Sequence, residues 1–176
     1  MRRKHLGLER SQANRMATAQ TTRRDRSVGE LAEEAVWFAL HTLLAVVLLG
    51  AVVGAITLAH PNPGSASPKI LATVLAFLAP LIGGYAVARI WPNPSARYVW
   101  ISGLLLFSAV SVWVLDLPTG KGLCEGCGAT EKLWRTFFFS IHRGSGLMGG
   151  DGLLVGAWTP LSMIGYALGA ALGLQR

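Results

Sequence analysis

Four long apolar stretches dominate the pattern of hydrophobic and polar positions along the chain. They cover residues 35–59, 70–88, 98–115 and 153–174, and none of them contains Asp, Glu, Lys or Arg. Because an α-helix rises about 1.5 Å per residue, about 20 residues are needed to cross the ~30 Å hydrocarbon core of a bilayer. The pattern therefore predicts an all-α integral membrane protein with four transmembrane helices.

The connections between these stretches differ strongly in length. Proline-rich segments at 60–68 and 91–94 make the first two connections short, and we expect the second and third helices to form an antiparallel hairpin. Pro80 and Pro160 fall inside predicted helices, where we expect kinks because neighbouring helices can satisfy the freed carbonyls. The third connection, 116–152, is far longer, and loops of this length are often functional.

A second periodicity lies inside the long connection. In residues 129–142 apolar side chains recur on one helical face, and most charged side chains lie elsewhere. Since the segment is too short to cross a bilayer, we expect an amphipathic helix in the membrane interface. It could be a lid over the bundle, a docking surface for another membrane protein, or a gate over a cavity. The apolar face consists of Leu133, Trp134, Phe137, Phe138 and Ile141.

Composition changes this picture mainly at the N-terminus. Apolar residues make up 52% and charged residues 14% of the 176 residues, whereas soluble proteins average about 25% charged. Eight of the 16 Lys and Arg residues lie within the first 26 positions. We therefore predict that residues 1–28 are a disordered basic tail and residues 29–176 the transmembrane domain. A tail of this kind is not the basic folded face that nucleic acid requires, so we expect no nucleic-acid partner.

The positions of the basic residues also predict the orientation. With the tail, the second connection and the C-terminus in the cytoplasm, eleven of the sixteen Lys and Arg residues lie inside, as the positive-inside rule favours. Lys69 and four residues of the long connection lie on the other side. We therefore expect both termini in the cytoplasm, in a bacterial inner (plasma) membrane. Among the aromatic residues, Trp113 and Trp158 would lie near the outer interface.

The two cysteines, Cys124 and Cys127, form a Cys-x-x-Cys pair just before the amphipathic segment. In an oxidising compartment such a pair closes a structural disulfide, which is our expectation. The alternative is a redox-active dithiol, because the N-terminus of the following helix would stabilise a thiolate. A metal site would need more ligands, and there is no second cysteine pair. Haem attachment is excluded because Gly128 stands where that motif requires His.

Inside the predicted helices, one histidine and two glycine series are notable. His41 is either a hydrogen-bonded packing residue or a ligand for haem, quinone or metal, and we predict no cofactor or metal site from it alone. Glycine at every fourth position lets helix backbones approach closely, within one bundle or between subunits. The series are Gly50 and Gly54 in the first stretch, and Gly165, Gly169 and Gly173 in the fourth.

No motif names a substrate or a reaction. The sequence contains no phosphate-binding glycine-rich loop with its lysine, no His-Glu-x-x-His and no Gly-x-Ser-x-Gly. The charge-free helices also disfavour a proton pump or an ion-coupled transporter. We expect a non-enzymatic accessory or scaffold subunit of a membrane complex, with other subunits or further copies as partners. The alternatives are an extracytoplasmic thiol–disulfide redox protein and a small solute channel or transporter.

Overall fold

The computed structural model describes residues 28–60, 66–116, 126, 128–137 and 156–175. Every regular element among these residues is a helix. The chain divides into two compact units, Met1–Val36 and Trp37–Arg176. In the first unit, the described part is the exposed beginning of helix α2 (Val28–Ala59). The predicted tail, residues 1–28, lies outside the described residues except for Val28.

Three helical segments in the described part of the chain are long and apolar enough to cross a membrane. They are α2, α3 (Ala66–Ile90), and the segment Pro94–Asp116, in which a 3-10 helix η1 (Pro94–Tyr98) precedes α4 (Trp100–Asp116). The prediction of an all-helical membrane protein is confirmed at this level. The remaining apolar helix, α6 (Trp158–Leu174), has 17 residues and a length of about 25 Å, which is short for a full crossing.

Several helix ends differ from the predicted stretches because hydropathy marks the membrane core and not the hydrogen-bonded helix. α2 begins at Val28, and its first turns carry three glutamates, which favour helix and suit the positive N-terminal end of the dipole. α6 begins at Trp158 and not at 153, since Gly156 and Ala157 form a turn and 153–155 lie outside the described residues. The amide of Gly156 donates instead to the carbonyl of Thr136 (2.7 Å).

The two prolines expected to kink helices occupy different positions. Pro160 lies in the first turn of α6, where a proline nitrogen has no helical hydrogen bond to lose. The prediction of a kink at Pro160 is therefore wrong. Pro80 is buried in the interior of α3, and the helix continues on both sides of it. The kink at Pro80 stays a prediction.

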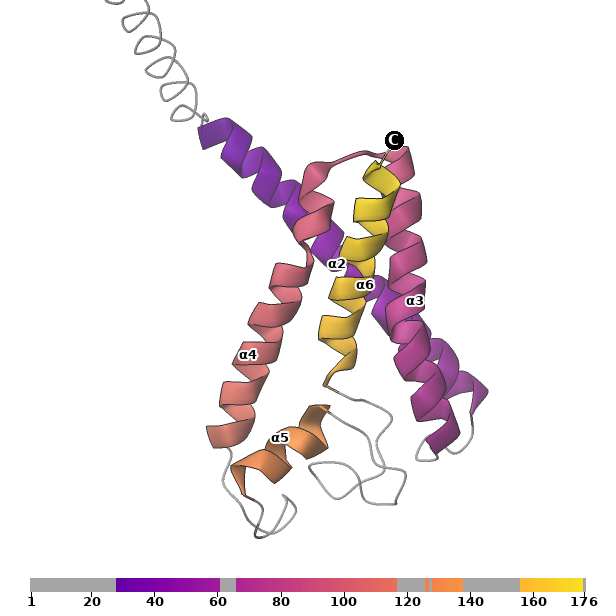
Figure 1. The fold of residues 1–176 in the computed structure, drawn as a ribbon, viewed down its shortest axis with the longest axis vertical. Coiled ribbons are helices and arrows are strands. Elements are labelled where there is room, and N and C mark those ends of the chain that lie inside the picture. Colours follow the sequence, from indigo (N-terminus) through magenta and orange to yellow (C-terminus); the bar gives the residue numbers. More distant parts are fainter. Residues whose placement is uncertain (1–27, 61–65, 117–125, 127, 138–155, 176) are drawn as a thin grey trace, which may run out of the picture. The chain divides into compact units, whose positions relative to one another are not determined.

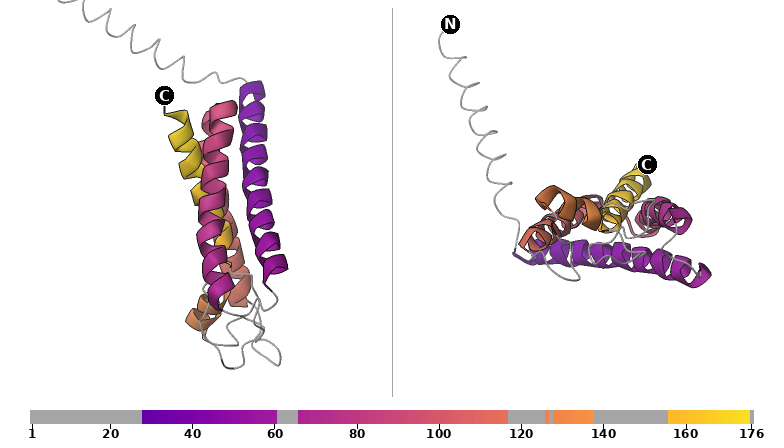
Figure 2. Two further views of the ribbon diagram at one scale, coloured as in Figure 1. Left: turned by 90° about the vertical axis from the view of Figure 1, so that its right-hand side faces the viewer. Right: turned by 90° about the horizontal axis from the view of Figure 1, so that it is seen from below.

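Helix α6 lies between α3 and α4, and the part of α2 that follows Trp37 crosses one side of this layer (Figures 1 and 2). The contact of α6 with α3 is the most extensive in this unit, and α4 packs against α6. The predicted hairpin of α3 and α4 is therefore not a closely packed pair, because α6 separates the two helices. The sequence order alone did not predict this insertion.

The contact between α3 and α6 is a close approach of two parallel helix backbones. A Cβ atom added at any of the three α6 glycines would collide with a backbone carbonyl oxygen of α3. The colliding pairs advance by four residues on both helices, so the two helices keep one register along the contact. Glycine permits such an approach because it has no Cβ atom. The pairs are Gly165 with Phe77, Gly169 with Leu81, and Gly173 with Tyr85.

The glycines of α2 have a different environment. A Cβ atom added at Gly50 or Gly54 would have no described atom within 4 Å. Helix α2 contacts its neighbours through its other side, where the Leu48 side chain lies against Gly83 and the Ala45 carbonyl accepts a hydrogen bond from Ser162 (3.1 Å). Two glycine series with the same spacing therefore have different neighbours, and only one of them lies inside a helix contact among the described residues.

Two residues that were expected at the edge of the membrane are buried in the protein. Trp158 is 1% exposed, and its Nε1 donates to the Thr73 hydroxyl (2.8 Å), which donates to the Lys69 carbonyl (2.8 Å). The indole attaches α6 to α3, and the position of Trp158 near the outer interface stays a prediction. Lys69 is also 1% exposed. It is not a loop cation, because α3 begins at Ala66 and includes it.

The α3–α6 contact predicts that Gly169→Ala destabilises the folded protein. The added methyl group would collide with backbone atoms of α3, which cannot rotate away, so we expect a loss of about 1–3 kcal/mol. Gly50→Ala is the matched control, because the same methyl group meets no described atom within 4 Å. Thermal unfolding in a detergent that separates subunits measures both. Equal melting temperatures of the two variants would contradict the close approach.

Candidate functional site

Cys124 and Cys127 lie outside the described residues, but their neighbours show what the pair precedes. Gly126 has a φ of +75°, in the left-handed region that glycine adopts readily. Helix α5 (Ala129–Phe137) begins directly after Gly128, whose carbonyl accepts a hydrogen bond from the Lys132 amide (3.1 Å). The cysteine pair therefore comes just before the N-terminus of a helix. Whether the pair is a disulfide stays a prediction.

Helix α5 has the start that the sequence predicts, at Ala129. It is described as far as Phe137, and the rest of the predicted segment, 138–142, lies outside the described residues. Leu133 is half-buried and Phe137 is buried, both beside α4, whereas Trp134 is exposed. Among the described residues of the predicted apolar face, Leu133 and Phe137 thus pack against the protein, and Trp134 does not.

His41 is buried where α2 meets α6. Its side chain is 3% exposed, and its Nδ1 lies 2.7 Å from the hydroxyl oxygen of Tyr166. The imidazole ring lies 6.0 Å from the ring of Trp37 and 5.8 Å from that of Tyr166, measured between centroids. The Nε2 atom is buried and has no hydrogen-bond partner among the described residues. His41 is thus hydrogen-bonded through one nitrogen only.

The surroundings of His41 limit its chemistry. A structural metal site takes about four ligands, and the described residues contain no group of three His, Cys, Asp or Glu side chains that could hold an ion. A buried polar atom without a partner costs about 1–3 kcal/mol. The hydrogen bond to Tyr166 joins α2 to α6, as expected of a packing residue, and a ligand role of the other ring nitrogen stays untested.

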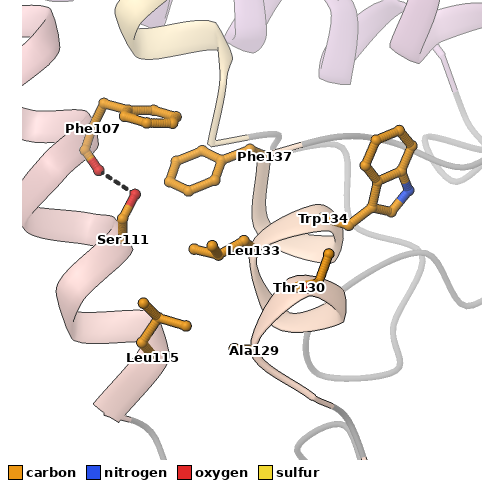
Figure 3. A pocket seen from close by; sticks show the side chains of 8 residues that line it. All are labelled: Phe107, Ser111, Leu115, Ala129, Thr130, Leu133, Trp134 and Phe137. Atoms are coloured by element: carbon orange, nitrogen blue, oxygen red, sulfur yellow. Dashed lines mark hydrogen bonds between the residues drawn. The ribbon is translucent and has the colours of Figure 1, made fainter.

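An apolar groove lies between α4 and α5 (Figure 3). Its volume is about 410 Å³, within the range of about 300–1,000 Å³ of small-ligand sites. Leu133 and Phe137 point from α5 toward α4, and the rings of Phe107 and Phe137 lie 4.3 Å apart between centroids. The groove is lined by Phe107, Ser111, Leu115, Ala129, Thr130, Leu133, Trp134 and Phe137.

Several described polar groups near the groove already have partners. The Ser111 hydroxyl donates to the carbonyl of Phe107 (2.7 Å), within α4. The Lys132 ammonium donates to the carbonyl of Leu115 (3.5 Å) at the end of α4, and the half-buried Arg135 pairs with the exposed Glu131 (2.7 Å). The groove therefore offers a ligand mostly apolar surface.

Some residues that shape these features were not predicted. A Cβ atom added at Gly84 would collide with the Tyr166 carbonyl, and one added at Gly103 would lie 2.8 Å from the Cβ atom of Met163. Neither glycine belongs to a recognisable series in the sequence. Tyr166 could have been found, because a tyrosine hydroxyl in an apolar helix needs a polar partner, and His41 is a suitable one in another predicted helix.

The contact between His41 and Tyr166 predicts an energetic coupling between the two side chains. Tyr166→Phe removes the hydroxyl and leaves the His41 imidazole without its hydrogen bond. In a double-mutant cycle of Tyr166→Phe and His41→Phe, we expect a coupling of about 0.5–1.5 kcal/mol, typical of hydrogen bonds between membrane helices. Unfolding of the four proteins in detergent measures it. Strictly additive effects would mean that the hydrogen bond contributes nothing.

Comparison with known proteins gives no match. No protein-family model matches the chain, and neither a curated protein nor a solved structure is significantly similar to it. The grounds for a function are therefore the features of the chain itself. These are the spanning helices, the two glycine series, the cysteine pair before α5, and the groove between α4 and α5.

Proposed function

We propose that this protein is a non-enzymatic accessory or scaffold subunit of a larger membrane assembly. The observation that carries the proposal is the open environment of Gly50 and Gly54 on α2. A residue that faces only lipid needs to be apolar, but it has no reason to be small. Pairs of small residues four positions apart favour helix–helix contacts in membranes. The partner surface is therefore the side of α2 that carries these two glycines.

The exposed apolar residues beside the two glycines support this assignment. Leu43, Val46 and Val47 lie on the same side of α2 and are between 42% and 59% exposed. Together with Gly50 and Gly54 they form a shallow strip, about 16 Å long from residue 43 to residue 54. A second helix could approach its backbone closely there, since the glycines leave a depression between larger side chains. We call these five residues the α2 strip.

The proposal places the protein in a bacterial inner membrane with four passes and both termini in the cytoplasm. The excess of basic residues in the tail, in the second connection and at the C-terminus supports this orientation. Helix α6 runs parallel to α3, and it contacts η1 of the second connection. If α6 crosses the membrane as the fourth pass, in the same direction as α3, the two helices are parallel and α6 ends on the side of the second connection.

The subunit proposal predicts that the protein leaves the membrane in a particle larger than one chain when it is extracted with a mild detergent. Gly50→Leu combined with Gly54→Leu is expected to release the single chain, because the two side chains fill the depression in the α2 strip. Size-exclusion chromatography with light scattering measures the particle mass.

The matched control is Ala51→Leu combined with Ala55→Leu. These two alanines have the same spacing on the same helix, are exposed, and lie about 100° around the helix from the glycines. The control is expected to leave the particle intact. A wild-type protein that elutes as a clean single chain, with nothing bound, would rule out the proposal.

A second candidate function is thiol–disulfide exchange by Cys124 and Cys127 on the outer face of the membrane. The observation that favours it is the start of α5 at Ala129, two residues after Cys127. The unpaired amides and the dipole at a helix N-terminus stabilise a nearby thiolate, which is the reactive form of cysteine.

The redox candidate predicts that the Cys124 thiolate of Cys127→Ser attacks a partner disulfide, releases one partner sulfur as a thiolate, and remains in a mixed disulfide because Cys127 is absent. Non-reducing electrophoresis of the variant, followed by mass spectrometry of the shifted band, detects this species. After reduction, a membrane-impermeant maleimide is expected to label the wild-type pair in intact cells, since the proposed topology places it outside. A pair that resists reduction and traps no partner would be a structural disulfide. Labelling of the pair only after lysis would contradict the proposed topology.

A further inference from the structure

We propose that the groove between α4 and α5 is a binding site for one acyl chain of a membrane phospholipid. This inference is independent of the subunit proposal, because the α2 strip contributes no residue to the groove. Carbon atoms make up nearly all of the surface, and the Ser111 hydroxyl is already used by the Phe107 carbonyl. A ligand that needs hydrogen bonds would find few partners, whereas a hydrocarbon chain needs none.

The depth of the groove matches one leaflet of a bilayer. Phe107, Ser111 and Leu115 line it at successive turns of α4, so it extends about 12 Å along that helix. Half of the hydrocarbon core is about 15 Å thick. Because α4 is part of a segment that can cross the membrane and ends at the exposed Asp116, the proposal sets the α4 wall of the groove among the acyl chains of one leaflet.

The groove is narrow for a helix. A volume of about 410 Å³ over a length of about 12 Å gives a mean cross-section of about 34 Å². A helix about 10 Å in diameter needs about 80 Å². A single hydrocarbon chain needs only roughly 20 Å², because its carbon atoms lie about 4 Å from their neighbours. The groove therefore has room for one chain, and the rings of Phe107 and Phe137 lie against each other in its lining.

The charges of the described residues at the end of α4 do not select a headgroup. Lys132 donates to the Leu115 carbonyl there, and Arg135 pairs with Glu131 one turn further along α5. With the exposed Asp116 at the end of α4, the two cations are balanced by two anions. A lipid held in the groove would therefore be selected by its chain, and zwitterionic and anionic phospholipids are expected to bind alike.

Photolabelling of the full chain in nanodiscs tests this inference. The probe is phosphatidylcholine with a diazirine in the middle of one acyl chain, and adducts are located by mass spectrometry. We expect adducts at Phe107 and Leu133, and a several-fold loss of the Phe107 adduct in Leu133→Trp, whose larger side chain fills the groove. Ser111→Phe fills it from the opposite wall and is expected to act in the same way. The control Val112→Trp, at a 69% exposed position of α4 outside the lining, leaves the adduct unchanged.

Three results would overturn the inference. Adducts spread evenly over Phe107, Leu133 and exposed positions such as Leu105 would mean ordinary boundary lipid only. Unchanged labelling of Phe107 in both filling variants, with unaltered melting temperatures, would mean that the chain binds elsewhere. Absence of any adduct in the groove would mean that protein covers it. A parallel series with phosphatidylglycerol tests the headgroup, and much stronger labelling by this anionic lipid would overturn selection by the chain.

Discussion

The close approach of α6 to α3 is the contact on which the rest of the described structure depends. In lipid there is no hydrophobic gain from bringing two apolar helices together, so association relies on dispersion between closely fitting surfaces. The α6 glycines provide that fit, because they let its backbone lie against the carbonyl groups of α3 in one register. This register sets the positions of Tyr166, Ser162 and Trp158, from which the polar contacts to α2 and α3 are made.

Those polar contacts are few, and each has a partner on another helix. His41 contacts Tyr166, Ser162 donates to the Ala45 carbonyl, and Trp158 donates to Thr73. Hydrogen bonds between membrane helices contribute modestly to stability, so they cannot replace the backbone contact. They do select among arrangements that glycine packing alone would allow, since a rotated helix would leave these groups unpaired in an apolar environment. The Nε2 atom of His41 is an exception, because it is buried and has no hydrogen-bond partner among the described residues.

The sequence predicted the helices better than their neighbours. Hydropathy located α2, α3 and α4, because residues that face lipid or core must be apolar, and the periodicity of 129–142 gave the start of α5. Hydropathy missed the seven residues at the start of α2, because glutamate favours a helix although it is not apolar. It also did not predict that Trp158 and Lys69 are buried, because burial depends on where a helix begins and on what covers it. The position of α6 between α3 and α4 depends on which side each glycine faces, which spacing does not reveal.

The surfaces that are available for partners lie on different helices. Helix α6 has nine of its 17 residues buried, and its exposed large apolar side chains are Ile164, Leu168 and Leu172. Helix α2 has large apolar side chains exposed on the side away from α6, and its two glycines lie among them. The α4–α5 groove is narrow and apolar, so it suits a chain of carbon atoms and not a helix. Because the strip and the groove are on different elements and share no residue, a protein partner and a lipid chain can occupy them without competing.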